Sequence, residues 1–116
     1  MTLQHLSEPA YELSTYAIDV AFLDDAGAAV VPASATWTLT DVRGVVVNGR
    51  DGVAISGLAS TVSIPLTGLD LEYNPTSYLG TRREVLIEFV YSSALGSGLS
   101  GKVAATFDIQ PLAGVP

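Results

Sequence analysis

The chain has 116 residues, a length typical of one domain, and 48% of them are apolar while only 15% are charged. Its net charge is −7, with Lys102 as the only lysine, which argues against nucleic-acid binding because that affinity comes from lysine and arginine neutralising phosphates. The absence of cysteine excludes disulfides and thiolate metal sites. A surface so short of charge is either rich in threonine, serine and glycine or partly covered by a partner, and we favour the partner.

The first 13 residues contain no basic segment that leads into an apolar run, so we expect no signal peptide. No stretch approaches the ~18–20 continuous apolar residues that cross a bilayer. We therefore expect a protein that is kept or assembled in a cytoplasm, with no membrane partner. Residues 1–13 and 111–116 lack regular alternation and are predicted to be extended tails that order against a partner.

Between these tails, apolar residues recur with a period of two, which predicts strands. The first strand covers residues 16–22, followed by a turn at residues 24–27, and the second covers residues 34–40, where Trp37 faces inward and threonines face outward. Asn48-Gly49 then predicts a type I′ hairpin turn, because both of its central positions need positive φ.

Three further strands are predicted at residues 61–66, 83–93 and 103–109, and Pro65 places the first of them at an edge or a bulge. Residues 68–82 form the longest irregular stretch and are expected to carry a short 3₁₀ turn and the functional loop. Together these elements predict an all-β fold over residues 14–110, an immunoglobulin-like Greek-key β-sandwich of about seven antiparallel strands.

GSGLSGKV, at residues 96–103, comes close to a phosphate-binding loop. Gly96, Gly101 and Lys102 fit the pattern, but Val103 stands where the magnesium-binding hydroxyl belongs. Such a loop also needs a helix after the lysine, whereas the following residues alternate as a strand does. We therefore predict no nucleotide binding and interpret GSGLSG as a hairpin loop between the last two strands.

No other pattern indicates chemistry. The acidic residues Asp24, Asp25, Asp51, Asp70 and Glu72 lack the alternating spacing of a calcium loop and are interpreted as turn and surface residues. The sole histidine lies in the N-terminal tail, where a serine–histidine–aspartate arrangement is poorly supported. We predict a non-enzymatic protein with no catalytic residue, no cofactor, no metal and no small-molecule substrate.

The chain resembles a family of small immunoglobulin-like proteins encoded near head and connector genes of tailed bacteriophages. The resemblance is carried by DDAGAAVVPASATWTLTD (residues 24–41), VVNGR (46–50), ISGLASTVSIPLTGLDL (55–71) and REVLIEFVYSSALGSGL (83–99). These positions are turn glycines and alternating strands, so they imply a fold. The resemblance further implies a virion or assembly component without a catalytic motif, and the N-terminal tail departs from what it leads us to expect.

The favoured interpretation is a phage virion structural protein, first of all a capsid decoration (cement) protein that binds the major capsid protein or other virion subunits, with self-association left open. A head–tail connector or tail accessory protein is the alternative within this class, and a host-surface glycan-binding module using Tyr73, Tyr78 and Tyr91 is the alternative outside it. Arg82 and Arg83 are interpreted as solvated charges that pair with Glu84 or Glu72, with an inter-subunit salt bridge as the alternative. The candidate interface comprises tail, loop and strand-entry residues: Leu3, His5, Leu6, Tyr11, Leu71, Tyr73, Tyr78, Leu79, Arg82 and Leu112.

Overall fold

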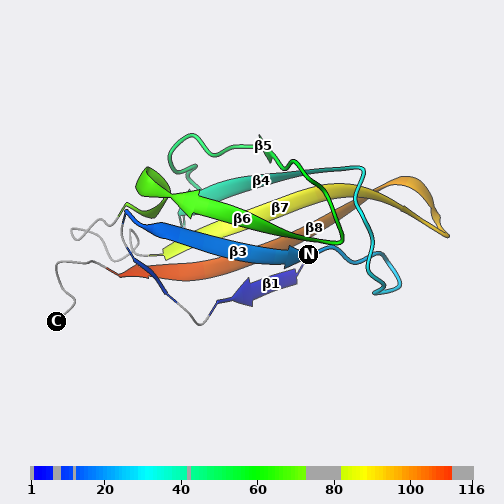
Figure 1. The fold of residues 1–116 in the computed structure, drawn as a ribbon, viewed down its shortest axis with the longest axis horizontal. Helices are drawn as coiled ribbons and strands as arrows, with labels where there is room; N and C mark the ends of the chain where they lie inside the picture. The colour runs from blue at the N-terminus through cyan, green and yellow to red at the C-terminus, as the bar shows by residue number, and fades with distance from the viewer. Residues whose placement is uncertain (1, 7–8, 12, 42, 73–81, 111–116) are drawn as a thin grey trace.

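A computed structural model of the chain describes residues 2–6, 9–11, 13–41, 43–72 and 82–110. The prediction of an all-β protein is confirmed, since strands dominate the described residues and the one helical element among them is a short 3₁₀ turn (Figure 1). In chain order the elements are β1 (Thr2–His5), β2 (Ala10–Tyr11), β3 (Thr15–Ala21), β4 (Ser34–Asp41), β5 (Val53–Ala54), β6 (Thr61–Thr67), η1 (Gly68–Leu71), β7 (Arg82–Ser93) and β8 (Gly96–Gln110).

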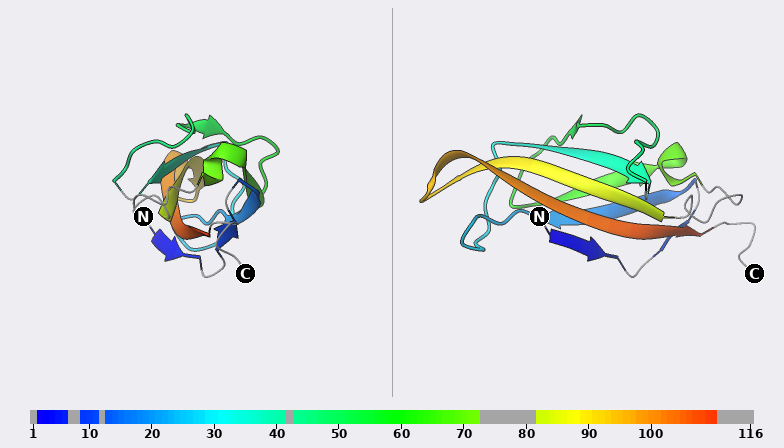
Figure 2. Two further views of the ribbon diagram at one scale, coloured as in Figure 1. Left: turned by 90° about the vertical axis from the view of Figure 1, so that its left-hand side faces the viewer. Right: turned by 180° about the vertical axis from the view of Figure 1, so that it is seen from behind.

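The strands form two facing layers. One sheet has the order β1-β8-β7-β4-β5, with β2 also paired to β8, and within the described ranges the other sheet consists of β3 and β6. β7 and β8 make a long twisted hairpin that runs past the two-stranded sheet (Figures 1 and 2). The molecule is accordingly elongated, with extents of 51 × 24 × 21 Å.

The predicted inward faces of the strands are confirmed. Alternate residues of five strands are buried between the sheets, namely Ile18, Val20, Trp37, Leu39, Ile64, Leu66, Val85, Ile87, Phe107 and Ile109. Aromatic rings hold the two ends of this core: Phe22 meets Phe89 edge-on with centroids 5.0 Å apart, and Tyr16 stacks on Phe107 at 4.9 Å. Each of these five strands therefore turns one face to the core, with Tyr16, Val62 and Val103 partly buried at its margin.

The N-terminal segment differs from the predicted tail. β1 and β2 both pair with β8 in parallel, so the fold is not purely antiparallel. Backbone hydrogen bonding along a sheet edge does not require the alternating apolar residues on which the prediction depended. Residues 2–5 and 10–11 are thus edge strands, while residues 111–116 lie outside the described part of the chain.

The Asn-Gly turn is confirmed, but its flanks pair differently from the prediction. Asn48 and Gly49 have φ of 55° and 65°, and the Arg50 amide donates to the Val47 carbonyl across the turn. Beyond that one bond the flanks turn to β4 instead of pairing as a hairpin: the Val47 amide donates to the Leu39 carbonyl, and the Leu39 amide donates to the Arg50 carbonyl. Residues 46–54 therefore close the β4 edge of the large sheet, ending in β5.

The predicted GSGLSG loop is wrong, because residues 96–101 already belong to β8. The reversal occurs one step earlier, at Ala94 and Leu95. Gly101 lies directly opposite Phe89 on the inner face, and a Cβ atom at Gly101 would overlap the Phe89 ring. The glycine that matched the phosphate-loop pattern is explained by the packing of this ring.

We expect Gly101→Ala to lower the free energy of unfolding by about 1–3 kcal/mol, because the added methyl group must displace a packed aromatic ring. Urea denaturation of the variant and of Ser100→Ala, a change at the exposed neighbouring position, measures the effect. Equal stability of the two variants would contradict this account of the glycine.

Candidate functional site

One end of the molecule gathers segments from most of the chain. β3 begins where β6 ends, with Thr15 opposite Thr67, and in the large sheet Asp41 lies opposite Arg83. β2 also ends here, because Tyr11 pairs with Gln110 at the end of β8. We call this the η1 end, defined by residues 10–11, 13–14, 41, 43–47, 67–72, 82–83 and 108–110 (Figure 1).

Exposed apolar side chains concentrate at the η1 end. Among the described residues, eight large apolar side chains are exposed, and three of these, Leu23, Val31 and Leu95, lie towards the opposite end. The remaining five are at the η1 end: Tyr11, Leu13, Val45, Val46 and Leu69. Exposed apolar groups that gather in this way are typical of an interaction surface.

Two of these side chains are displayed by a constrained backbone. Leu13 has a φ of 56°, a left-handed conformation that is rare for leucine, and its amide donates to the Leu71 carbonyl at 3.0 Å. Val45 is held by Asp41, whose carboxylate accepts hydrogen bonds from the amides of Arg43 and Val45 at 2.8 and 3.1 Å. Strained backbone held in place by its surroundings is frequent at functional sites.

The buried carboxylate of Asp70 lies beneath this surface. Its Oδ1 accepts from Asn48 Nδ2 at 2.9 Å and from Arg50 Nε at 2.8 Å, and its Oδ2 accepts from the Thr67 amide at 3.0 Å and from Arg50 Nη2 at 3.3 Å. The Asp70 side chain is fully buried, while that of Arg50 is 34% exposed. A single carboxylate thus joins the Asn-Gly turn to the end of β6.

These contacts also fix the charge state of Asp70. Burial alone raises the pKa of Asp70, but the hydrogen bonds from Arg50, the Thr67 amide and Asn48 outweigh it and hold the pKa below its usual value. The same partnership raises the pKa of Arg50. The Arg50 guanidinium lies 5.6 Å from the ring centre of Trp37, so the ion pair is supported by the core itself.

Arg83 is a second buried charge at the η1 end. Its Nη2 donates to the Glu72 carbonyl at 2.6 Å, and the side chain points between the sheets with only 5% of the residue exposed. Burial lowers the pKa of Arg83, while Asp41 and Glu72 oppose this shift. The interpretation of residues 82 and 83 as a solvated pair is therefore wrong for Arg83, whereas Arg82 is 47% exposed and pairs with Asp108 at 3.0 Å.

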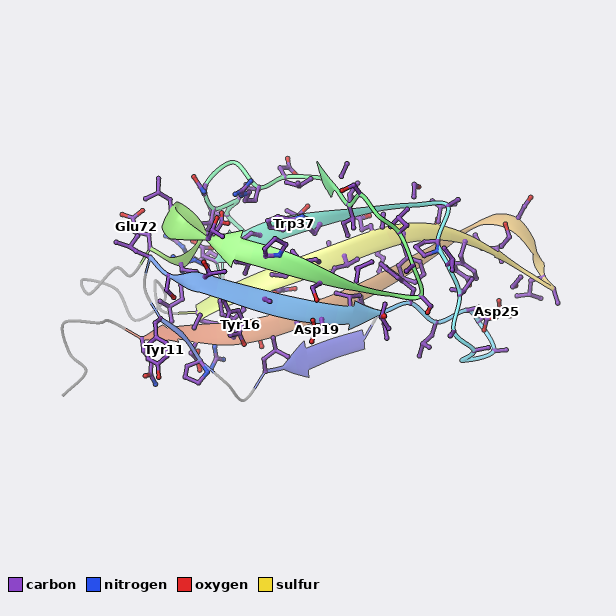
Figure 3. All side chains as sticks on the ribbon, in the orientation of Figure 1. Tyr11, Tyr16, Asp19, Asp25, Trp37 and Glu72 are labelled. Carbon is purple, nitrogen blue, oxygen red and sulfur yellow. The ribbon has the colours of Figure 1, made fainter. Side chains whose placement is uncertain are left out.

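The structure places only part of the predicted interface at the surface. Tyr11 and Arg82 lie exposed at the η1 end (Figure 3 labels Tyr11), while Leu6 is partly buried against the core. Leu71 is a correction, because its side chain is fully buried in the core. The side chains of Leu3 and His5, and all of Tyr73, Tyr78, Leu79 and Leu112, lie outside the described residues; β1 shows only that backbone positions 3 and 5 pair with β8.

Four exposed residues of the η1 end were missed from sequence, namely Leu13, Val45, Val46 and Leu69. The available signal was an apolar residue beside a turn glycine or outside the alternating pattern, as in the run of three valines before Asn48. Alternation identifies residues that face the core, but it does not show which of the remaining apolar residues meet at one end.

Comparisons with protein-family models, curated proteins and solved structures gave no match. Within the described ranges, no helix is long and apolar enough to cross a bilayer. The η1 end offers apolar and aromatic side chains at its surface, supported from below by charges that are already engaged. Such a surface gains free energy when its apolar groups are removed from water, and tyrosine is enriched among the interface residues that contribute most to affinity.

We expect Asp70→Asn to lower the free energy of unfolding by about 2–3 kcal/mol at neutral pH, because the amide cannot satisfy all the donors that face it. Since the pKa of Asp70 is depressed in the folded state, its contribution is present above about pH 4 and is lost as the pH falls through the lower folded value. The stability difference between wild type and variant should therefore shrink on acidification.

Urea unfolding at about pH 7 and about pH 2.5 measures this difference. Asp51→Asn is the matched control, since it removes an exposed carboxylate and should change stability by no more than about 0.5 kcal/mol at neutral pH. A difference between wild type and Asp70→Asn that stays constant with pH would refute the charge assignment.

Proposed function

We propose that this protein is a non-enzymatic structural component of a tailed-phage virion that binds other virion subunits through the η1 end. The observation that carries the proposal is that five of the eight exposed large apolar side chains among the described residues lie at this end, one of them, Leu13, on left-handed backbone. If the η1 end docks, the tip of the long β7–β8 hairpin projects away from the partner subunit. The assignment to a phage particle rests on the resemblance to immunoglobulin-like phage proteins.

We propose more finely that the fold is an immunoglobulin-like Greek-key sandwich. Support comes from the strand order: β8, β7, β4 and β5 lie side by side in one sheet, β3 and β6 pair in the other, and the N-terminal strand joins the far edge parallel to β8. Immunoglobulin domains typically carry a buried tryptophan on the strand that begins the second sheet. The buried ring on β4 fits that position.

Capsid decoration is the favoured placement, with the major capsid protein as the partner and the virion as the site of action. A chain with a net charge of −7 is not attracted to packaged DNA, so an outer-shell position suits it. A head–tail connector or tail accessory position fits the same surface.

The glycan-binding alternative is weaker. It needs aromatic rings grouped on one exposed face, yet Tyr91, one of its three candidates, is buried in the core and packs against Phe89. Of the aromatic residues that the structure describes, Tyr11 is the exposed one. The other two candidates, Tyr73 and Tyr78, lie outside the described residues, so the part of the chain that the structure describes presents no group of exposed aromatic rings.

Quantitative peptide mass spectrometry on gradient-purified particles tests the placement. We expect a copy number equal to that of the major capsid subunit or to a simple fraction of it. A ratio of a few per cent would instead place the protein in the connector or tail. Complete absence from the particle would overturn the virion proposal.

Substitutions at the η1 end test the docking surface. We expect Leu69→Asp and Val45→Asp each to weaken binding of the purified protein to undecorated particles by about tenfold or more, because each places a charge in an apolar contact. Leu95→Asp, at the 73% exposed tip of the opposite end, is the matched control and should bind normally. The proposal fails if the tip variant loses binding while the other two retain it.

A further inference from the structure

The two-stranded sheet has one open edge, and it lies on β3. The Phe22 amide donates to the Ser60 carbonyl, and the Gly68 amide donates to the Ser14 carbonyl, so residues 14 and 22 both direct backbone groups toward β6. Alternate residues of a strand direct these groups to opposite sides. The N–H and C=O groups of Thr15, Ala17, Asp19 and Ala21 therefore point away from β6, and in the described residues no strand pairs with them.

The opposite edge of the same sheet is blocked. By the same register, odd-numbered residues of β6 face away from β3, and Pro65 is one of them. Proline has no N–H, so it interrupts the row of donors that an added strand would need. β3 contains neither proline nor lysine nor a bulge, the usual protections of an edge strand, and two of its edge residues are alanines.

An apolar groove runs along this open edge. It has a volume of about 260 Å³ and lies between β3 and the inner face of β8. Its lining includes Leu6, Ile18, Val20, Ile87, Val103 and Ala105. The N-terminal strand β1 pairs with β8 in the other sheet (Figures 1 and 2), so among the described residues no strand lies hydrogen-bonded beside β3 at this groove.

We propose that the open edge of β3 is an acceptor site for an extended strand of another protein. The strand would join the sheet as a third member, bonding to the odd-numbered backbone groups of β3, while every second side chain, apolar in kind, enters the groove. The seven residues of β3 offer ~23 Å of edge. This inference is independent of the virion assignment and of the η1 end.

Charge identifies the kind of strand. Asp19 is exposed at the centre of the edge, on the outer face, and it borders the groove (Figure 3). A partner strand that carries lysine or arginine on its outer face, next to Asp19, would form a cross-strand ion pair. A second copy is disfavoured because antiparallel pairing of two β3 strands about a twofold axis brings two Asp19 carboxylates onto the same face, in chains that each carry −7.

The state of the edge is tested by amide hydrogen exchange on the ¹⁵N-labelled monomer. We expect fast exchange at Ala17, Asp19 and Ala21 and slow exchange at Ile18 and Val20. Protection of the odd-numbered amides in the monomer would show that the chain already covers its own edge, which would overturn the proposal. Sedimentation that reveals a dimer dissociated by Ala17→Pro would assign the site to a second copy and would equally overturn it.

Acceptance of a strand is tested with two synthetic seven-residue peptides of alternating valine and threonine, with a central lysine or glutamate on the threonine face. We expect the lysine peptide, titrated to millimolar concentration, to shift and protect the odd-numbered β3 amides and to bind about fivefold more tightly than the glutamate peptide. Asp19→Lys should reverse this preference. Absence of shifts with the lysine peptide, or an unchanged preference in Asp19→Lys, would overturn the proposal.

Two matched proline variants distinguish loss of an N–H group at the open edge from loss of folding. Ala17→Pro removes one N–H from the open edge without removing a bond to β6, so we expect a well-dispersed spectrum and at least tenfold weaker peptide binding. Thr61→Pro makes the same change on the far edge of β6 and should leave binding intact. Equal binding by both variants would contradict the assigned edge even if both remain folded.

Discussion

Two strands, β3 and β6, must cover the inner face of a much wider sheet, and the rest of the architecture follows from this mismatch. Between the layers the chain uses its largest side chains, with Trp37, Phe22 and Phe107 all buried. Both long sides of the core still need closing. On the β4 side, residues 46–54 fold back along the strand and Arg50 covers Trp37; on the β8 side, Leu6 only borders the groove.

Electrostatics reinforces this asymmetry. The chain has five basic residues, and each is already engaged within the fold: Arg43 with Asp41, Arg50 with Asp70, Arg82 with Asp108, Arg83 with the Glu72 carbonyl and Lys102 with Glu88. Positive charge is thus used to secure turns and strand ends. The remaining acidic groups, including the exposed Asp19 and Asp51, set the sign of the surface that a partner meets. A basic partner is the complement that such a surface favours.

The sequence was informative wherever one face of a strand meets the core. Alternation identified the buried rows of β3, β4, β6, β7 and β8 because burial imposes a period of two on the residues themselves. Alternation did not predict β1 and β2, because these strands pair with β8 through backbone groups along an edge, and such pairing imposes no period on the side chains. The Asn-Gly pair likewise fixed its own turn dihedrals, but not the strand that its flanks would join.

The candidate site was less predictable for a related reason. Leu71 and Leu69 are two positions apart in one 3₁₀ turn, yet one is buried in the core and the other is 57% exposed. Which of them reaches the surface depends on where Asp70, between them, is anchored, and its partners Asn48 and Arg50 are about twenty residues away in the chain. Long-range polar contacts of this kind carry no local sequence pattern, so only the fold reveals them.

The separation of the η1 end from the β3 edge has a consequence for assembly. An apolar patch at one end and a strand acceptor along one side would engage two different neighbours, or two elements of one neighbour, at the same time. The second contact is then intramolecular, and its effective concentration depends on geometry rather than on the amount of free protein. Two contacts that are each weak can hold a small domain firmly on a repeating lattice, and neither needs to bury the area of a permanent interface. Under these two proposals, selectivity comes from shape more than from charge, because a neighbour must fit both surfaces at once.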